Sequence, residues 1–189
     1  MAPASCHHST TCAFNRSTEK GLTHPELVAT ASKLLEDEEQ YRAKPYMCSE
    51  RYPTVGFGQR IGPRDAPLSV YRFTLPRPVA ETWLRINVAL LAGQLVTHPT
   101  IAPAFAAANL ARQTILLSMA YQLGVNGLAR FENTLKAAAS GDWRAAARHA
   151  LDSRWARQTP QRAKRHAMAL ERGELVGAMT LTANAGEQR

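Results

Sequence analysis

Apolar residues recur every three or four positions over most of this chain, which is the spacing of a helix with one buried face. The first such segment opens at Pro25, a residue suited to the first turn of a helix. Its apolar positions are Leu27, Ala31, Leu34 and Leu35. We therefore expect a helix that begins near residue 25 and ends in the acidic stretch that closes with Glu39.

A second, longer apolar helix is predicted over about residues 78–96. Its apolar residues occupy two neighbouring faces, one with Val79, Trp83, Ile86 and Leu90, the other with Leu84, Val88, Leu91 and Leu95. Apolarity over so wide an arc predicts burial on several sides, as for a helix that joins two lobes. Pro99 should stop this helix.

Residues 41 to 73 have a different pattern, rich in proline and glycine. The segment 54–61 alternates like a strand, and Arg51-Tyr52-Pro53 predicts a turn before it. We expect a small β-ribbon lobe over about residues 41–75. The predicted fold class is therefore α+β: a ribbon lobe, a linking helix and a helical lobe.

The rest of the chain is predicted to be helical. Residues 106–121 are rich in alanine and leucine, and Gly124 and Gly127 should break that helix. Asp142 is a suitable N-cap for a helix over 143–151, because its carboxylate can accept a hydrogen bond from a free backbone amide. Thr159-Pro160 has the pattern of a helix start, with the threonine hydroxyl as the cap, and Gly173 is a suitable stop.

These segments divide the chain into a flexible arm (residues 1–22), one folded domain (23–178) and a tail (179–189). Within the domain we expect the ribbon lobe, the linking helix at about 78–96 and a helical lobe at about 100–178. A chain of 189 residues is long enough for one such domain with a real core.

The charge balance points to a polyanionic partner. The formal net charge is +8, which favours nucleic acid, an anionic membrane surface or an anionic cell wall. The sequence contains no run of eighteen apolar residues, so no membrane-spanning helix is predicted. The N-terminal residues lack the pattern of a secretory signal. We therefore expect the protein to start in a cytoplasm.

Cysteine is sparse, with three residues at Cys6, Cys12 and Cys48. An odd number does not imply a complete disulfide framework. Cys6 and Cys12, with the two histidines between them, could bind a metal ion, but a disordered tail is the better interpretation because no second ligand pair follows at zinc-finger spacing.

The candidate chemistry lies where the first helix meets the ribbon. Glu39 is followed after eight residues by Cys48 and after five more by Thr54. This set offers one proton donor and two groups that can position water, which is what cleavage of a glycosidic bond requires. By residue type alone, each has a plainer explanation: a surface carboxylate among four acidic residues, a small buried thiol, and a β-branched strand residue.

Two blocks of sequence give this chain a specific resemblance. The first is residues 38–58, with the Glu-x8-Cys-x5-Thr spacing and the ribbon motif Thr54-x-Gly56-Phe57-Gly58. The second runs from residue 118 to 173, and its most specific stretch is Ser-Arg-Trp at 153–155 followed by Gln-Thr-Pro-Gln-Arg-Ala-Lys-Arg at 158–165. Over about residues 25–178 the chain resembles the T-even phage type of lysozyme and the wider phage endolysins, glycoside hydrolase family 24.

The resemblance implies a two-lobed α+β fold with a glycan cleft between the lobes. It implies hydrolysis of the β-1,4 bond between N-acetylmuramic acid and N-acetylglucosamine in peptidoglycan, and lysis of a bacterial host. The protein is expected in the host cytoplasm before release and acts at the cell wall, in the periplasm. It implies no metal and no organic cofactor. A monomer that binds peptidoglycan, with no nucleic-acid partner and no stable membrane insertion, is the matching expectation.

The family pattern also assigns roles to residues. Glu39 is the general acid, with Arg162 as the arginine that fixes its orientation, and Cys48 and Thr54 act on the attacking water. The positions that match cleft residues of the family, and are expected to contact the glycan, are Gly58, Tyr121, Gln122, Thr134 and His149. Phe131, Trp143 and Trp155 are expected to belong to the core.

The chain departs from the family pattern at three cleft positions. Cys48 stands where the T-even enzymes have aspartate, Gln59 replaces a histidine, and Arg60 replaces an apolar residue. Some endolysins carry cysteine at the first position, so activity is still expected. Arg42, Lys44 and Arg51 are near enough in sequence to lower the pKa of the Cys48 thiol.

Two other functions stay open. A lytic transglycosylase acts on the same bond with one acid and closes an anhydro ring without water, although Thr54 argues against it. A cationic protein that binds walls or permeabilises membranes would need no catalytic residue. Product analysis separates the first alternative, and lysis that survives Glu39→Gln would support the second.

Overall fold

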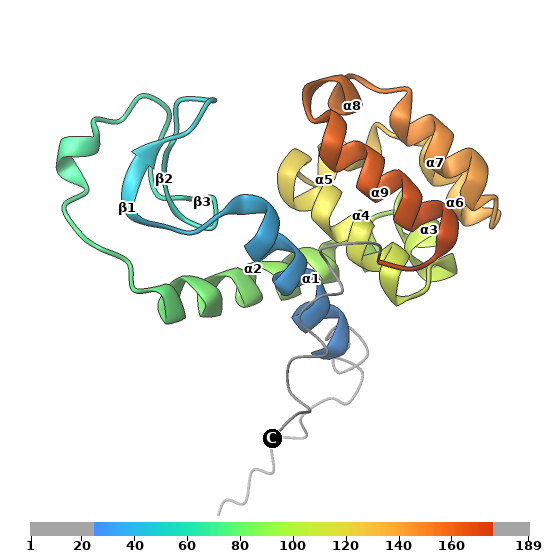
Figure 1. Cartoon of the computed structure of the whole chain (residues 1–189), viewed down its shortest axis with the longest axis horizontal. Helices are drawn as coiled ribbons and strands as arrows, with labels where there is room; N and C mark the ends of the chain where they lie inside the picture. The colour runs from blue at the N-terminus through green and yellow to red at the C-terminus, as the bar shows by residue number, and fades with distance from the viewer. Residues whose placement is uncertain (1–24, 176–189) are drawn as a thin grey trace, which may run out of the picture.

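The computed structural model describes residues 25–175 and shows an α+β molecule in which a small antiparallel sheet precedes a mostly helical body (Figure 1). The fold class predicted from the sequence is confirmed. The arm, the tail and the Cys6–Cys12 segment lie outside the described residues. The elements in chain order are α1 (Pro25–Glu39), β1 (Arg42–Met47), β2 (Pro53–Gly56), β3 (Gln59–Arg60), a 3-10 turn (Leu68–Val70), α2 (Arg77–Thr97), α3 (Ala102–Ala107), α4 (Leu110–Leu123), α5 (Val125–Ala129), α6 (Glu132–Ala139), α7 (Trp143–Leu151), α8 (Arg154–Gln158) and α9 (Pro160–Arg172).

The ribbon is a three-stranded sheet in the order β1-β2-β3. The alternating segment 54–61 is not a single strand, because the chain reverses between β2 and β3. Gly56 and Gly58 have φ angles of +65° and +85°, a backbone region that favours glycine. A Cβ on Gly56 would lie 2.4 Å from Gln59 Oε1, so the hairpin also needs the space that glycine leaves.

The helix ends agree with the sequence in part. Asp142 caps α7 by accepting a hydrogen bond from the Ala145 amide at 2.9 Å, and Gly173 ends α9 with a φ of +75°. Thr159 stands at the N-cap of α9, but its hydroxyl does not cap the helix: it donates to the Trp155 carbonyl, 3.1 Å away. The Thr159 hydroxyl therefore satisfies a carbonyl group of the preceding helix α8.

The helical lobe is divided more finely than the sequence indicated. The alanine- and leucine-rich stretch is split between α3 and α4, with the Asn109 side chain capping α4. Gly124 ends α4 with a φ of +76°, as predicted. Gly127 does not break a helix, because it lies inside the short helix α5.

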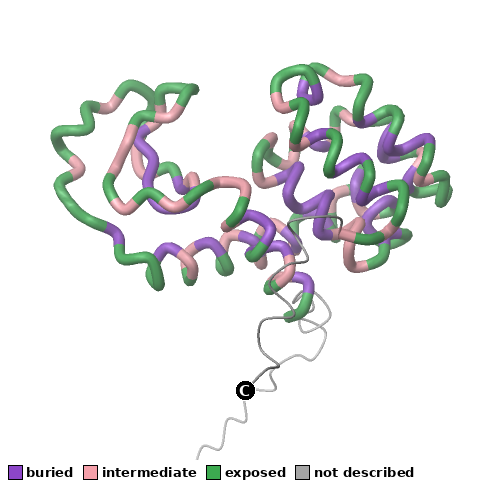
Figure 2. The backbone as a smooth tube through the Cα atoms, in the orientation of Figure 1, coloured by how far each residue is buried: buried purple, intermediate pink, exposed green. Residues whose placement is uncertain are grey.

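Helix α2 links the ribbon to the helical body along one edge of the molecule (Figure 1). Its buried residues form one face: Ala80, Leu84, Val88, Ala92 and Leu95. The neighbouring face is mostly exposed, contrary to the prediction, and only Trp83 on it packs against the core. Val79, Ile86 and Leu90 have exposed fractions of 51%, 54% and 64%, and the turns of α2 that face away from the rest of the chain are coloured as exposed in Figure 2.

The core runs from α1 and α2 into the helical body, where α7 packs against α6 and α9. Trp155 is buried in this core, and Phe131 and Trp143 pack against it while remaining partly exposed. Between residues 25 and 175 no helix combines the length and the apolarity needed to cross a membrane.

Candidate active site

A pocket of about 720 Å³ lies where the ribbon approaches the helical body. It collects residues from α1, the ribbon, α2 and α4. Its lining is Glu39, Tyr46, Cys48, Ser49, Glu50, Thr54, Gly58, Gln59, Arg60, Asn87, Tyr121, Gln122, Leu123 and Gly124. The three residues of the predicted catalytic set, which are spread over sixteen positions of sequence, therefore border one space.

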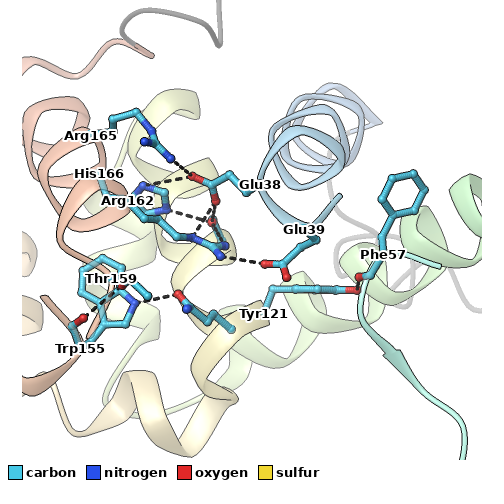
Figure 3. A network of polar contacts seen from close by, with 11 residues as sticks. Glu38, Glu39, Phe57, Tyr121, Trp155, Thr159, Arg162, Arg165 and His166 are labelled. Carbon is cyan, nitrogen blue, oxygen red and sulfur yellow. Dashed lines mark hydrogen bonds and ion pairs between the residues drawn. The ribbon is translucent and has the colours of Figure 1, made fainter. Parts of the chain in front are cut away.

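Glu39 is the last residue of α1, and the chain turns away from the helix at Gln40, whose φ is +52°. The Glu39 side chain is 22% exposed. Arg162 Nη1 donates a hydrogen bond to Glu39 Oε1 at 2.8 Å, as Figure 3 shows. The other oxygen, Oε2, lies 3.6 Å from the position of a Cβ on Gly58, so it borders the pocket beside the ribbon turn.

Cys48 follows β1 directly and is partly exposed, so it is not a buried apolar residue. The Tyr52 amide donates to its sulfur at 3.4 Å. Burial acts to raise the pKa of Cys48, but the Tyr52 amide, the Thr54 hydroxyl, the Glu50 amide and the Arg60 charge together hold it below its ordinary value.

The cation near Cys48 is not one of those expected from the sequence. Arg60 lowers the thiol pKa, whereas Arg51 pairs with Asp65 and Arg42 stacks on the Tyr46 ring at 4.3 Å. Arg60 comes from β3, which the sheet register places opposite Thr54. The pKa of Cys48 is therefore lowered by a cation across the ribbon, Arg60, and not by the cations next to Cys48 in sequence.

Thr54 is almost fully buried, with an exposed fraction of 2%. Its hydroxyl donates to the Tyr52 carbonyl at 2.9 Å and also lies close enough to Cys48 to favour the thiolate. The lone pairs of Oγ1 remain as acceptors. Thr54 can therefore hold a water molecule by accepting a hydrogen bond from it.

Tyr121, from α4, ties the ribbon turn to the helical body. Its hydroxyl donates to the Phe57 carbonyl at 2.8 Å, across 64 positions of sequence (Figure 3). Burial and the nearby Glu39 carboxylate raise the pKa of Tyr121, so the phenol stays protonated and remains a donor. This bond holds Gly58 beside Glu39.

A neighbouring pocket of about 700 Å³ contains two of the other predicted contact residues, Thr134 and His149. Gly58, Tyr121 and Gln122 line the first pocket together with Glu39, but Thr134 and His149 do not. Glu50 and Leu123 line both pockets. The two pockets are therefore adjacent.

Gln122 is fixed between the two pockets by its contact with α8. Trp155 Nε1 donates to Gln122 Oε1 at 2.7 Å, which leaves the Gln122 amide group as the donor that can serve a ligand. Trp155 is thus a core residue that also lines a pocket.

A buried polar network behind Glu39 was not anticipated from the sequence. In the sequence Glu38 is one of four consecutive acids with the pattern of a solvated surface, but its side chain is only 4% exposed. Arg162 Nε lies 2.8 Å from Glu38 Oε2, and Ser118 Oγ donates to the same oxygen at 2.9 Å. Arg162 Nη2 donates to Ser118 Oγ at 2.9 Å, so Ser118 bonds to both Arg162 and Glu38. Figure 3 shows Arg162 beside Glu38.

His166 closes this network from α9. Its Nε2 lies 2.9 Å from Ser118 Oγ and its Nδ1 lies 3.7 Å from Glu38 Oε1. Burial, with the Arg162 and Arg165 charges, lowers the pKa of His166 to about 3, so the imidazole is neutral. Burial raises the pKa of Glu38, against the opposing Arg162 charge and Ser118 hydrogen bond.

The described residues offer no metal centre: residues 25–175 contain no group of three or more His, Cys, Asp and Glu side chains arranged to hold an ion. The chemistry open to the pocket is that of its own side chains. These are a carboxyl group, a thiol with a lowered pKa and a water-accepting hydroxyl.

Known proteins with sequences similar to this chain include a phage spike protein and a lysozyme. The sequence is 31% identical to "Pre-baseplate central spike protein Gp5" of Enterobacteria phage T4 over 160 residues, which cover 76% of this chain and 28% of that protein. It is 24% identical to "Probable T4-type lysozyme 1" of Dictyostelium discoideum over 166 residues, which cover 79% of this chain and 98% of that protein. The chain is therefore similar in sequence to a T4-type lysozyme over most of that protein's length, and to part of a phage spike protein.

The two relatives define the extent of this similarity. The lysozyme relative is matched over nearly its whole length, whereas the match spans less than a third of the spike protein. No protein-family model matches the chain. The aligned region of this chain therefore corresponds to only part of the much longer spike protein.

Proposed function

We propose that this lysozyme-like protein hydrolyses the β-1,4 bond between N-acetylmuramic acid and N-acetylglucosamine in bacterial peptidoglycan, and so lyses bacterial cells. The observation that carries the proposal is the meeting of Glu39, Cys48 and Thr54 at one pocket, behind which Arg162 holds Glu39. The sequence similarity to a T4-type lysozyme supports the same reaction class.

Glu39 acts as the general acid. Arg162 occupies Oε1, so the proton to be transferred is carried on Oε2, the oxygen beside Gly58 in the pocket. This proton goes to the glycosidic oxygen as the bond from that oxygen to the anomeric carbon breaks. The departing sugar leaves with a hydroxyl group.

Water completes the reaction from the opposite face of the sugar. Thr54 Oγ1 accepts one hydrogen bond from the water and orients it toward the anomeric carbon. The Cys48 thiolate stabilises the positive charge on the sugar ring and takes the proton that the water loses, and its lowered pKa suits both roles. The outcome is inversion at the anomeric carbon.

The remaining pocket residues bind the glycan. Gly58 presents backbone without a side chain, Tyr121 fixes that turn, and the Gln122 amide is oriented by Trp155. Thr134 and His149 extend the binding surface into the adjacent pocket. The net charge of +8 suits an anionic wall, and no cofactor or permanent partner is required.

The test is turbidity loss of outer-membrane-stripped Gram-negative cells with purified variants. Glu39→Gln should lower clearing at least about a thousandfold, because it removes the proton donor, which is consistent with the size of general-acid effects. Asp37→Asn is the matched control: an exposed acid two positions earlier in α1 that should clear like wild type. Clearing by Glu39→Gln at the wild-type rate would overturn the assignment in favour of a cationic wall- or membrane-binding protein.

Cys48 is tested in the same assay. Cys48→Asp should keep activity within about tenfold because it retains an anion, whereas Cys48→Ser should lose at least about a hundredfold. Equal activity of the serine variant and wild type would limit Cys48 to a structural role. Mass spectrometry of the products then separates hydrolysis, which gives a reducing-end sugar, from a lytic transglycosylase, which gives an anhydro sugar.

A further inference from the structure

The guanidinium group of Arg162 is divided between two carboxylates. Nη1 donates to Glu39 at 2.8 Å, Nε lies 2.8 Å from Glu38, and Nη2 donates to Ser118 at 2.9 Å. The Arg162 side chain is only 10% exposed, and that of Glu38 only 4%, so water screens these charges weakly. Figure 3 shows Arg162 between the two acids.

This arrangement bears on a conflict in the proposed reaction. A general acid must carry its proton when substrate binds, but an arginine in direct contact stabilises the carboxylate form. An undivided Arg162–Glu39 pair would therefore work against proton donation while it fixes the orientation of Glu39. The second carboxylate, Glu38, lets Arg162 keep the orientation of Glu39 while it stabilises the ionised form of Glu39 less strongly.

We propose that Glu38 is a positioning residue that shares the Arg162 charge with Glu39, so that Arg162 orients the acid without fully stabilising its ionised form. The proposal rests on the proposed function of Glu39. Glu38 touches no reacting atom, and it acts on Glu39 through the shared Arg162 and through the direct repulsion between the two carboxylates. Its burial at the end of α1, one position before Glu39, puts it on the inner side of the same guanidinium.

The groups that face the pair come from every neighbouring element. Helix α9 contributes Arg162, Arg165 and His166, α4 contributes Ser118 and Tyr121, and β1 contributes Tyr46. His166 is neutral, and the tyrosines stay protonated, so the charged members are two acids and two arginines. Arg165 Nη2 lies 3.5 Å from Glu38 Oε1. Neutralising Glu38 therefore leaves this network with an excess positive charge.

The test is Glu38→Gln, which keeps the shape of the side chain and an oxygen that can accept the Ser118 hydrogen bond. The titration of the Glu39 carboxyl group, followed by carbon-13 NMR and assigned with Glu39→Gln, should move to lower pH by on the order of one pH unit. The limb of the kcat/KM profile on soluble peptidoglycan that follows the Glu39 titration should move in the same direction by the same amount. Activity on the acidic side of the profile should stay within about threefold of wild type.

A merely structural role for Glu38 gives a different result. It predicts an equal loss of activity at every pH and an unchanged Glu39 titration, and that outcome would overturn the proposal. Asp37→Asn, which neutralises the exposed acid before Glu38, is the control and should move neither readout. The NMR titration needs no activity, so it tests Glu38 even if peptidoglycan is not the substrate.

A second variant covers the case in which Glu38→Gln fails to fold. Arg165→Gln changes a side chain that is 45% exposed and removes a charge that competes for Glu38. Glu38 then draws more of the Arg162 charge, and the Glu39 titration should move to higher pH, the opposite direction. A shift to lower pH, or none, would contradict charge sharing.

Discussion

At the scale of single residues, the least expected feature is a neutral histidine in the core. His166 has an exposed fraction of 0% and contacts Ser118 and Glu38. Its pKa in the folded protein is lowered to about 3, whereas an unfolded chain binds the proton near pH 6.5. Between these values the unfolded state holds more protons, so acidification draws the equilibrium toward unfolding.

The predicted consequence is a loss of stability below pH 6.5 that depends on His166. The contribution of neutral His166 to the free energy of unfolding is fully present above pH 6.5. It falls by up to about 1.4 kcal/mol for each pH unit as the pH drops toward the pKa of His166 in the folded protein. His166→Gln, which keeps a hydrogen-bonding group beside Ser118, should flatten this dependence. Urea unfolding of wild type and variant at pH 7, 6 and 5 measures it.

Two comparisons make that measurement specific. Glu38 is present in both proteins, so its own titration, which acts with the opposite sign, largely cancels. His149→Gln, at an exposed histidine, should reproduce the wild-type pH dependence. Parallel curves for wild type and His166→Gln would show that the buried imidazole has no part in acid unfolding.

The sequence indicated the proposed catalytic set of Glu39, Cys48 and Thr54 but not the network behind it, for a physical reason. Motif spacing identifies Glu39 because the chemistry fixes its neighbours, whereas Glu38 looks like one more acid in a solvated run. A signal was available in the periodicity. Glu38 continues the buried stripe of Leu27, Ala31 and Leu34, and a charged group on an apolar stripe needs a buried partner. His166 occupies such a position on α9, between buried Ala163 and Ala167.

At the scale of elements, α2 shows where apolar patterning is insufficient. Its apolar residues cover two faces, and the sequence gives no means to decide which face meets the core. The structure buries the face with the small residues Ala80 and Ala92, because these let neighbouring elements approach the helix closely. The face with Ile86 and Leu90 is left exposed.

Two matched substitutions in α2 test this assignment. Leu84→Ala should cost about 2–5 kcal/mol in the free energy of unfolding, because Leu84 is fully buried. Leu90→Ala removes the same atoms from a residue that is 64% exposed and should change the unfolding free energy by about 0.5 kcal/mol or less. Urea denaturation compares the two, and equal costs would mean that the outer face of α2 is covered in the folded protein.

In the ribbon, local residue types predict the lobe itself, but they do not predict the strand reversal or the long-range contact that fixes it. The proline and glycine content predicted the ribbon lobe, and Gly56 and Gly58 take the positive φ angles that a tight hairpin needs. Strand alternation alone could not show that residues 54–61 reverse direction. The contact that fixes the ribbon turn comes from Tyr121, which is too distant in sequence for any local pattern to indicate.

At the scale of the whole molecule, the site exists only because distant segments meet. The pocket around Glu39 combines the end of α1, the ribbon, Asn87 of α2 and the end of α4, while α9 supplies the arginine behind it. Sequence periodicity predicted these elements and the α+β class. It could not place Thr134 and His149 in a pocket separate from the one that contains Glu39, since that depends on how α6 and α7 pack.

The net charge of +8 leads to a last prediction, about the whole protein and its substrate. If attraction to an anionic wall concentrates the protein on cells, salt should weaken it, because the Debye length falls from about 30 Å at 0.01 M to about 8 Å at 0.15 M ionic strength. Clearing of stripped cells should slow at least about fivefold over this range. Cleavage of a short soluble glycan fragment, which carries few charges, should change by less than about twofold.

A charge variant separates this effect from a general effect of salt on the protein. Arg85→Glu reverses an exposed charge on α2, where the arginine makes only a long contact with Thr82, and lowers the net charge by two. Its clearing rate should be below wild type at low salt and should converge with wild type at 0.15 M, because screening removes the difference. The rate on the soluble fragment should match wild type throughout. Equal salt dependence on cells and fragment would instead place the effect in the cleft, where Arg60 pairs with Glu50 beside Cys48.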